Sequence, residues 1–478
     1  MLFNTFQYFI FLPIVFAFYW WANNKSVKLQ NFLLLIASYY FYACWDWRFL
    51  FLLIFSTGLD YYTGIKMQDA SSSKLKKSWF WLSICINVGF LGVFKYYNFF
   101  ASSFADLLSI FGFQVNIGTL EVILPVGISF YTFHGLSYVI DIYKNRIEPE
   151  RNIVDYSLFV SYFPLLVAGP IERATHLLPQ LKKKRIFSYS NAVDGLRQIL
   201  WGLFKKVVIA DNCAQIVNTI FDNPEGYSGS SLLLGAVFFA FQIYGDFSGY
   251  SDIALGTSRL LGIELLKNFN YPYFSRDIAE FWRRWHISLS TWFRDYLYIP
   301  LGGSQGGMLM KVRNTFIIFL VSGFWHGANW TFIVWGALNA LYIMPSIILN
   351  TNRNNLEIVA KGKFLPSVKD FCNILLTFGL TVIAWIFFRA ASVGQAFVYL
   401  KGIFSNSILS IPENLPKMEL LLCGCFLLME WLGRENNYAI ANFGKSWHVI
   451  FRWSFYLFLI LMLIYFGAKE QNFIYFQF

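Results

Sequence analysis

Long apolar runs separated by short polar segments dominate this chain. A helix crosses a bilayer when roughly 20 mostly apolar residues follow one another, because its backbone polar groups are then paired within the segment. Eight runs approach this length: 6–21, 31–45, 49–65, 78–94, 122–143, 371–388, 418–432 and 448–467. The stretch 315–350 is too long for one crossing and predicts a hairpin of two transmembrane helices.

The positions of the basic residues predict how these runs are oriented. Lys and Arg favour cytoplasmic loops, and none precedes the first run, whereas Lys25 and Lys28 follow it. The N-terminus is therefore expected outside the cytoplasm. Keeping the later basic loops inside requires that run 99–113 does not cross, and we expect it to lie in the membrane interface. Run 6–21 also lacks an A-x-A-like cleavage site, so we expect it to be a retained helix and not a cleaved signal peptide.

Run 156–170 has basic residues on both flanks and is interrupted by Pro164 and the Gly169-Pro170 pair. These residues break helices, so we expect a re-entrant segment. Two further crossings, 231–244 and 247–263, are expected to go out and back. The remaining basic residues are predicted to be cytoplasmic: Arg173, Lys182, Lys183, Lys184, Arg185, Arg197, Lys205, Lys206 and those of the stretch 259–313.

The pattern predicts an all-α, polytopic transmembrane bundle of about 11–13 crossings with additional re-entrant and interfacial helices. No internal repeat or low-complexity segment divides the chain, and we expect a single integral-membrane domain over residues 1–478.

Composition supports a membrane protein and narrows its partners. The chain is 57% hydrophobic and 14% charged, whereas soluble domains contain about 25% charged residues. A net charge of +11 would suggest nucleic acid in a soluble protein, but basic cytoplasmic loops explain it here. We therefore expect membrane lipid and no nucleic acid as a partner. The six cysteines have the spacing of neither a zinc site nor a disulfide framework, and no metal site is predicted.

His326 is the first candidate for chemistry among only five histidines. It lies about 11 residues into the predicted hairpin, which places it roughly 16 Å deep in a bilayer about 30 Å thick. An ionisable side chain at that depth indicates function, because burying it is costly. Gly323 and Gly327 flank it at helical spacing and would permit close packing or approach of a substrate. The alternative is a neutral histidine that hydrogen-bonds between helices.

His286 is the second candidate and lies in an amphipathic segment with tryptophans at 282, 285 and 292 on one helical face. The alternative is an anchoring helix at the interface, where Arg283 and Arg284 contact lipid phosphate. His134, inside a predicted crossing, is a weaker candidate.

Asp246 belongs to a polar, glycine-rich stretch, GDFSGYSD at 245–252. This stretch either lines a cavity or provides hydrogen bonds between helices. We find no G-x-S-x-G, P-loop, H-E-x-x-H or dinucleotide-binding motif, so nothing predicts metal chemistry or nucleotide hydrolysis.

Several segments together resemble the membrane-bound O-acyltransferase (MBOAT) family, and within it the bacterial alginate O-acetyltransferase-like and peptidoglycan O-acetyltransferase-like proteins. The segments are NFLLLIASYYFY (31–42), LPVGISFYTFHGLSYVIDIY (124–143), VAGPIER (167–173), YGDFSGYSDI (244–253), EFWRRWHISLSTWFRDYLYIPLGG (280–303), GFWHGAN (323–329) and FIYFQF (473–478). The resemblance runs nearly from end to end of the chain.

This resemblance implies that His326 is the catalytic histidine and His286 the second histidine of the family. It implies a ring-like helical bundle with a central tunnel open to both sides. An acetyl group from a cytoplasmic thioester, acetyl-CoA, would pass towards hydroxyls of an extracytoplasmic polysaccharide of the alginate, cellulose or peptidoglycan type. It further implies the bacterial cytoplasmic (inner) membrane, no permanently bound cofactor, and a periplasmic partner of the SGNH acetyltransferase type.

From these residues we expect His326 to act as a general base that removes the proton of the attacking hydroxyl. Trp325 and Asn329 are candidate hydrogen-bond donors to the developing oxyanion. Arg283 and Arg284 are candidates to attract the phosphates of CoA. Three alternatives remain: acyl transfer to teichoic acid (D-alanyl), lipid or protein; a transporter without acyl transfer; and an inactive membrane subunit.

Overall fold

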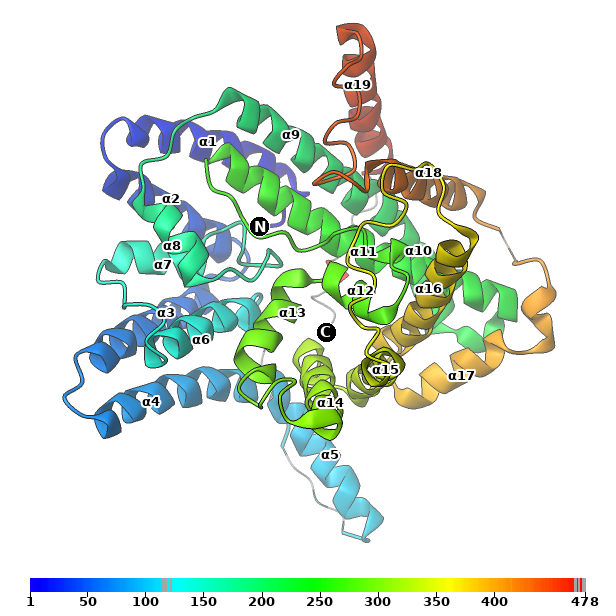
Figure 1. Ribbon diagram of the computed structural model, residues 1–478, viewed down its shortest axis with the longest axis horizontal. Helices are drawn as coiled ribbons and strands as arrows, with labels where there is room; N and C mark the ends of the chain where they lie inside the picture. The colour runs from blue at the N-terminus through cyan, green and yellow to red at the C-terminus, as the bar shows by residue number, and fades with distance from the viewer. Residues whose placement is uncertain are drawn as a thin grey trace. The chain divides into compact units, whose positions relative to one another are not determined.

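A computed structural model describes residues 1–113, 115, 118–120, 123–413, 415–467, 471, 473 and 474. Helices are the only regular elements within these ranges, which confirms the all-α prediction (Figure 1). The chain forms two compact units, and we describe each by itself. Unit 1 comprises Met1–Tyr189 and Ser258–Leu265, and unit 2 comprises Ser190–Thr257 and Leu266–Phe478. The expectation of a single domain stays a prediction.

Unit 1 contains eight α-helices and one π-helical segment within its described residues. They are α1 (Phe6–Asn23), α2 (Val27–Ala43), α3 (Trp47–Gln68), α4 (Ser73–Leu91), η1 (Gly92–Tyr96), α5 (Tyr97–Ile110), α6 (Ile128–Tyr143), α7 (Ile153–Ser161) and α8 (Ala174–Lys182). The first four apolar runs are thus confirmed as helices. Side-chain caps mark several starts: the Ser26 and Ser72 hydroxyls accept from the backbone N–H of Leu29 and Leu75.

Two predicted segments of unit 1 differ in detail from the apolar pattern. Run 122–143 begins at Val122, which lies outside the described residues, and its helix starts only at Ile128. Gly127 precedes that helix with φ +74°, a conformation that favours glycine. Run 156–170 leaves the helical conformation after Ser161, so the predicted break is confirmed.

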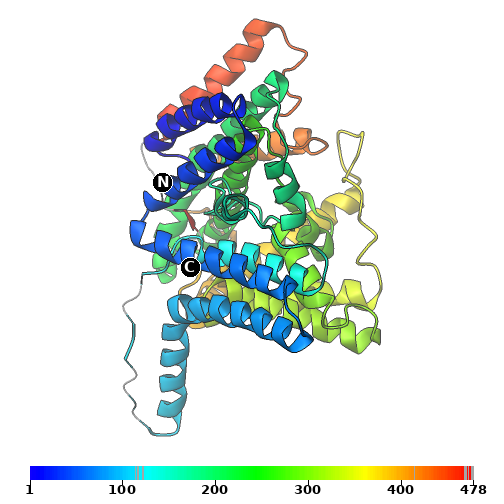
Figure 2. The same cartoon turned by 90° about the vertical axis from the view of Figure 1, so that its left-hand side faces the viewer.

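Run 99–113 falls mainly in α5, which follows α4 through η1, and Figure 2 shows α5 (cyan) turned away from the direction of α4. Its interfacial location stays a prediction.

Buried polar groups connect the helices of unit 1. The Asp60 carboxylate on α3 accepts from Ser83 Oγ at 2.6 Å and Asn87 Nδ2 at 2.8 Å, both on α4. His134 on α6 accepts, through Nε2, the backbone N–H of Glu172 at 3.0 Å. These groups therefore hold helices and a loop in place.

Unit 2 carries the rest of the helices. They are α9 (Tyr189–Leu203), η2 (Phe204–Ala210), α10 (Asp211–Asp222), η3 (Pro224–Gly226), α11 (Gly229–Leu260), η4 (Pro272–Phe274), α12 (Ile278–Arg284), α13 (Ile287–Phe293), η5 (Arg294–Tyr298), α14 (Gly307–His326), α15 (Trp330–Ile348), α16 (Val368–Arg389), α17 (Val393–Ile403), η6 (Asn406–Leu409), α18 (Lys417–Gly433) and α19 (Val449–Phe466). The last residues of α11 belong to unit 1.

The two crossings predicted at 231–244 and 247–263 are wrong, because α11 is one continuous helix of 32 residues. Its glycines make contacts instead of a turn. A Cβ on Gly245 would lie 2.9 Å from the carbonyl oxygen of Lys205, and one on Gly249 would lie 2.7 Å from that of Gly202. The absent side chains let α11 pack directly on the α9–η2 backbone, so the helix continues through both glycines.

Lys205 and Lys206 do not lie in an exposed loop, and their expected cytoplasmic position stays a prediction. Both are buried in η2. Lys205 Nζ lies 2.6 Å from Asp252 Oδ2, and Lys206 Nζ lies 2.8 Å from both Asp246 Oδ1 and Asp211 Oδ1. Burial of a lysine is tolerated when carboxylates pair with it, and α11 supplies two of these three carboxylates.

Seven helical segments among the described residues are long and apolar enough to cross a membrane: Phe6–Asn23, Ser73–Ile110, Gly229–Leu260, Gly307–His326, Trp330–Ile348, Val368–Arg389 and Val449–Phe466. The chain is a multi-pass membrane protein. Four other predicted crossings form α2, α3, α6 and α18, which are shorter or more polar. The total of about a dozen crossings stays a prediction.

Candidate active site

The α14–α15 hairpin places His326 at a turn. His326 is the last residue of α14, and Gly327 leaves the helix in an extended conformation. Asn329 then begins α15, because its Oδ1 accepts the backbone N–H of Thr331 at 3.0 Å. Its Nδ2 donates to the carbonyl oxygen of Ala391 at 2.9 Å. The predicted hairpin is confirmed, and the amide of Asn329 holds its turn; the oxyanion role stays a prediction.

Glycines let the two helices of the hairpin touch through their backbones. A Cβ at Gly323 would collide with the carbonyl oxygen of Phe332, and one at Gly336 would collide with that of Phe319. Close packing at Gly323 is therefore confirmed. Gly327 lies beyond the end of α14. The expectation that it shares a helical face with Gly323 is therefore wrong.

Aromatic rings enclose the imidazole of His326, which is 5% exposed. Its ring centroid lies 4.9 Å from Trp325, 5.1 Å from Trp335 and 5.2 Å from Phe388, at interplanar angles of 71°, 86° and 72°. These rings come from α14, α15 and α16. Such edge-to-face walls exclude water, and polar interactions strengthen in a dry site.

His286 lies in a break between two short helices. α12 ends at Arg284, Trp285 is extended, and His286 has φ +43° and ψ +55° before α13 begins. The prediction of one continuous helical face is therefore wrong. The backbone N–H of Asn270 donates to the Arg284 carbonyl at 2.9 Å, and that of Ile287 donates to the Asn268 carbonyl at 2.9 Å. The segment 268–270 therefore holds the backbone on both sides of His286.

The surrounding tryptophans are buried. Trp285 is 1% and Trp292 7% exposed, so they do not form the lipid-facing side of an interfacial anchor. Trp282 lies against the hairpin, where its Nε1 donates to Asn339 Oδ1 at 3.2 Å. The segment is thus part of the interior of unit 2.

The imidazole of His286 is held in one tautomer. Its Nδ1 lies 3.0 Å from Asn268 Oδ1, which also accepts from Ser288 Oγ at 2.9 Å. Because an amide oxygen only accepts, Nδ1 carries the proton and Nε2 carries the lone pair. Nε2 is buried and makes no hydrogen bond with any residue that the structure describes. Burial lowers the pKa of His286 to about 3, so the ring is neutral.

Trp325 connects the two histidines. Its ring centroid lies 6.3 Å from that of His286 and 4.9 Å from that of His326. Phe247 of α11 packs on the other imidazole, with 4.6 Å between the Phe247 and His286 rings. The structure therefore brings His286, Trp325 and His326 into one aromatic site.

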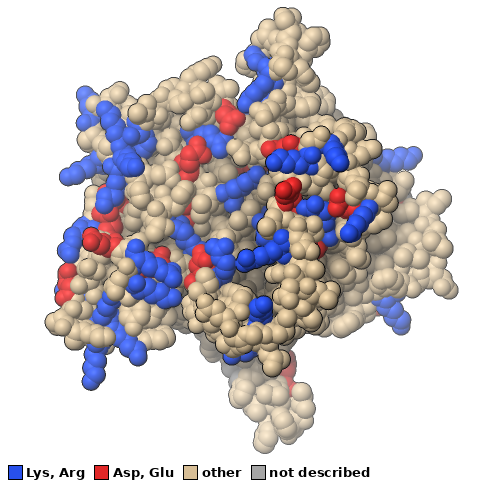
Figure 3. Space-filling view, in the orientation of Figure 1, with Lys and Arg blue, Asp and Glu red and all other residues tan. Residues whose placement is uncertain are grey.

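The two predicted arginines bind within the chain. Arg283 donates to the carbonyl oxygens of Asn352 at 2.7 Å and Asn355 at 2.9 Å. Arg284 pairs with the buried Glu280 at 2.8 Å. Figure 3 shows basic side chains gathered around α12 and the segment after α15. Contact with CoA phosphates stays a prediction.

Asp246 connects segments of unit 2, as expected if the stretch 245–252 provides hydrogen bonds between helices. Besides its pairing with Lys206, its Oδ2 accepts the backbone N–H of Ile474 at 2.7 Å. Phe473 packs against Tyr250 with 5.2 Å between ring centroids. Asp246 therefore ties the C-terminal segment to α11, next to the residue that contacts His286.

Sequence reasoning missed Asn268, Trp335 and Phe388. Trp335 and Phe388 carry no signal that separates them from the other aromatic residues, and Asn268 contacts His286 only because the chain folds back. The described residues contain no cluster of three or more His, Cys, Asp or Glu side chains that could hold a metal ion.

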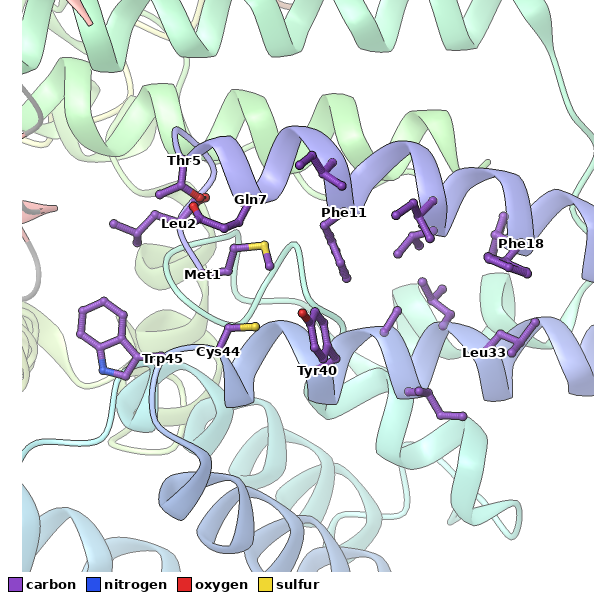
Figure 4. Close-up of a pocket in the computed structure, with 17 residues that line it drawn as sticks. Met1, Leu2, Thr5, Gln7, Phe11, Phe18, Leu33, Tyr40, Cys44 and Trp45 are labelled. Carbon is purple, nitrogen blue, oxygen red and sulfur yellow. The ribbon is translucent and has the colours of Figure 1, made fainter. Parts of the chain in front are cut away.

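An apolar groove of about 950 Å³ lies in unit 1 between α1 and α2. Figure 4 shows Phe11 and Phe18 of α1 facing Leu33 and Tyr40 of α2 across it. The lining of the groove is mainly apolar and includes no histidine.

Known proteins are similar to this chain over most of its length. The sequence profile of the membrane-bound O-acyltransferase family matches residues 146–388. A protein of Pseudomonas aeruginosa named "Probable alginate O-acetylase AlgI" is 37% identical over 436 residues, 90% of this chain and 81% of the relative. The peptidoglycan O-acetyltransferase of Helicobacter pylori is 38% identical over 84% of this chain and 79% of the relative. The teichoic acid D-alanyltransferase of Streptococcus thermophilus is 27% identical over 57% of this chain and 69% of the relative. The profile match and the two O-acetylating relatives show that this chain is an O-acyltransferase and belongs to the membrane-bound O-acyltransferase family.

Proposed function

We propose that this protein transfers an acetyl group from a cytoplasmic thioester, acetyl-CoA, towards hydroxyls of an extracytoplasmic polysaccharide, with His326 as general base. The likeness to alginate and peptidoglycan O-acetylating proteins supports acetyl as the group and polysaccharide as the acceptor. The observation that carries the proposal is the buried imidazole of His326 at the helix end, enclosed by three aromatic rings.

The chemistry requires a base because a hydroxyl is a weak nucleophile. His326 takes the hydroxyl proton while the oxygen attacks the thioester carbonyl. The new ester C–O bond forms, the C–S bond breaks, and the thiolate leaves and takes up a proton. A dry aromatic site favours the neutral imidazole before the reaction, because burial disfavours its charged form.

The helix ends in unit 2 support an acceptor side at His326. Lys311 and Arg313 lie in the first two turns of α14, and Arg353 follows α15. If these charges are cytoplasmic, His326 stands at the extracytoplasmic turn of the hairpin, about 20 Å along the helix from Arg313. This differs from the mid-bilayer depth predicted above, because α14 begins at Gly307 and not at residue 315. His286, flanked by Arg283 and Arg284, is then assigned to the donor side.

From the resemblance to the family we also propose a bacterial inner membrane as the location and a periplasmic SGNH-type acetyltransferase as the partner that completes transfer to the polymer. A second candidate is D-alanyl transfer to teichoic acid, which the similarity to the Streptococcus thermophilus D-alanyltransferase favours. The two functions share His326 but differ in donor and acceptor.

The test compares membranes that contain equal amounts of wild-type protein, His326→Ala and His448→Ala. His448 is exposed and serves as the control. Donor consumption and ester-linked acetate are measured with labelled acetyl-CoA, and in parallel with a D-alanyl carrier thioester. We expect the wild type and His448→Ala to transfer acetyl, and His326→Ala to lose at least about 100-fold of that rate. Full acetylation by His326→Ala would refute the general-base role, and use of only the D-alanyl donor would establish the second candidate.

A further inference from the structure

The candidate base fixes the region in which the transferred acyl group reacts. A general base takes its proton from an oxygen about 2.6–3.2 Å away, and that oxygen approaches the acyl carbon to about 3–3.5 Å before it attacks. The acyl carbon is therefore within about 6 Å of the His326 ring nitrogen that takes the proton. The rings of Trp335 and Phe388 have their centroids 5.1 and 5.2 Å from that of the imidazole, so both rings border this region.

The two reactants determine the direction in which the acyl group points. In the proposed function the thiol of the donor lies on the side of His286, and the Trp325 ring connects that side to His326. The acceptor hydroxyl reaches His326 from the extracytoplasmic side of the hairpin turn. The described residues on the other sides of the imidazole are Trp335 of α15 and Phe388 of α16, and the end of the acyl group faces these two rings.

A second layer of buried side chains holds both rings in place. Trp385 of α16 stacks on Trp335, with 5.7 Å between ring centroids and an interplanar angle of 18°. The Trp385 ring also lies 5.1 Å from that of Phe388, and the Phe332 ring lies 4.9 Å from Phe388. All four side chains are buried. Because a protein interior is close-packed, neither Trp335 nor Phe388 can turn aside without displacing a neighbour.

The backbone that carries Trp335 is fixed as well. Gly323 of α14 and Gly336 of α15 make contacts at which an added Cβ would collide with a carbonyl oxygen of the other helix. These contacts hold α15 against α14, the helix that ends at His326. The backbone therefore sets the spacing between the Trp335 ring and the imidazole.

We propose that Trp335 and Phe388 form the end wall of the acyl site and restrict this enzyme to the acetyl group. The inference rests on the proposed function and deepens it, because it names the residues that select the acyl group by its length. An acetyl group ends in a single methyl, which fits against an aromatic ring. A propionyl or butyryl group carries one or two further methylenes, and these would have to displace a ring that its neighbours hold.

The chemistry of transfer is the same for these three groups. In each case the hydroxyl oxygen forms an ester bond to the acyl carbon, the C–S bond breaks, and the thiolate takes up a proton. A preference for acetyl therefore reports on the space around the acyl group. A closed apolar site distinguishes two groups that differ by one methylene by about 10–200-fold.

The test offers an equimolar mixture of acetyl-, propionyl- and butyryl-CoA to membranes that contain the full-length protein. The loss of each thioester is followed by mass spectrometry, and the loss in membranes that lack the protein is subtracted. The variants are Phe388→Leu and Trp335→Phe, which enlarge the acyl site but keep an apolar side chain. Phe387→Leu is the matched control, because Phe387 is also buried on α16 but packs on Phe397 of α17.

We expect the wild type and Phe387→Leu to consume acetyl-CoA at least about 100-fold faster than butyryl-CoA. In Phe388→Leu and Trp335→Phe this ratio should fall by about tenfold, with propionyl-CoA in between. The ratio is measured within one mixture, so a smaller amount of folded variant does not change it. A purely structural role of the two rings would lower the consumption of all three donors together and leave the ratio unchanged.

Two results would overturn the inference: a wild type that consumes butyryl-CoA as fast as acetyl-CoA, or an unchanged ratio in both enlarged variants. Failure of the proposed function gives a different result. The wild type would then consume no acetyl-CoA, or His326→Ala would consume it as fast as the wild type. Either of these results also removes the inference that rests on the proposed function, whereas an unchanged ratio removes the inference alone.

Discussion

The Nδ1 atom of His286 lies 3.0 Å from the Oδ1 atom of Asn268, on the segment whose backbone also hydrogen-bonds to the chain on both sides of the histidine. The segment 268–270 therefore determines the backbone break at His286, the orientation of its imidazole ring and its tautomer. The lone pair of Nε2 is left without a hydrogen-bond partner among the described residues, inside the site that Trp325 shares with His326.

Asn268→Ala should remove this orientation and lower acetyl transfer by about tenfold, the size of one lost hydrogen bond. Asn268→Asp should keep the bond but stabilise the imidazolium, which raises the pKa of His286. Activity of Asn268→Asp should consequently fall at low pH where the wild type is unaffected. A pH–rate profile of both variants in proteoliposomes checks this prediction. Ser251→Ala is the control, because it removes only the hydrogen bond that Asn268 Nδ2 donates to Ser251 Oγ. Identical profiles for Asn268→Asp and wild type would contradict the assigned tautomer.

Gly323→Val should force α14 and α15 apart, because its side chain would meet the Phe332 backbone. Overpacking of this kind costs about 1–3 kcal/mol, and it should also displace His326. We expect a lower Tm in detergent and reduced transfer. Gly379→Ala is the matched control, since a Cβ there meets nothing within 4 Å. A Gly323→Val protein as stable as the control would show that the hairpin tolerates separation.

Lys206→Met should be strongly destabilising, because it leaves the carboxylates of Asp211 and Asp246 buried without their cation. Removing one partner of a buried pair costs about 3–5 kcal/mol. The double variant Lys206→Met with Asp246→Asn should recover part of that loss, since it removes one of the two uncompensated charges. Folded yield and Tm of the single and double variants measure the coupling. No recovery in the double variant would mean that the Lys206–Asp246 pair of 2.8 Å contributes little.

His176 should make stability depend weakly on pH. Its hydrogen bond with Glu172, at 2.8 Å, raises the pKa of His176 above the usual 6.5. The folded state therefore holds the proton more tightly, so the stabilisation is complete below about pH 6.5 and is lost as pH rises through the raised pKa. The side chain is 37% exposed, so the effect is small.

Thermal unfolding of wild type and His176→Gln between about pH 5.5 and 8.5 tests this prediction. The difference in Tm should shrink as pH rises, and a constant difference would exclude the linkage.

The sequence alone determined much of this protein. Apolar run length predicts the helices of unit 1 and the α14–α15 hairpin, because about 20 neighbouring residues suffice to specify a crossing. The rarity of histidine in an apolar chain singled out His286 and His326, and the motifs around them indicated the family. These signals are local, so they can be read without knowing what packs against them.

The tertiary structure decided whatever depends on distant partners. The glycines of α11 resemble a turn in the sequence, yet they are contact points because the α9–η2 backbone lies against them. Lys205 and Lys206 resemble loop charges, yet they are buried because carboxylates of α11 reach them. The segment around His286 has a helical pattern, yet it breaks because the Asn268–Asn270 backbone supplies hydrogen bonds that a continued helix would lack. A residue's own neighbours in the chain do not reveal such partners, and only the folded arrangement brings them within contact distance.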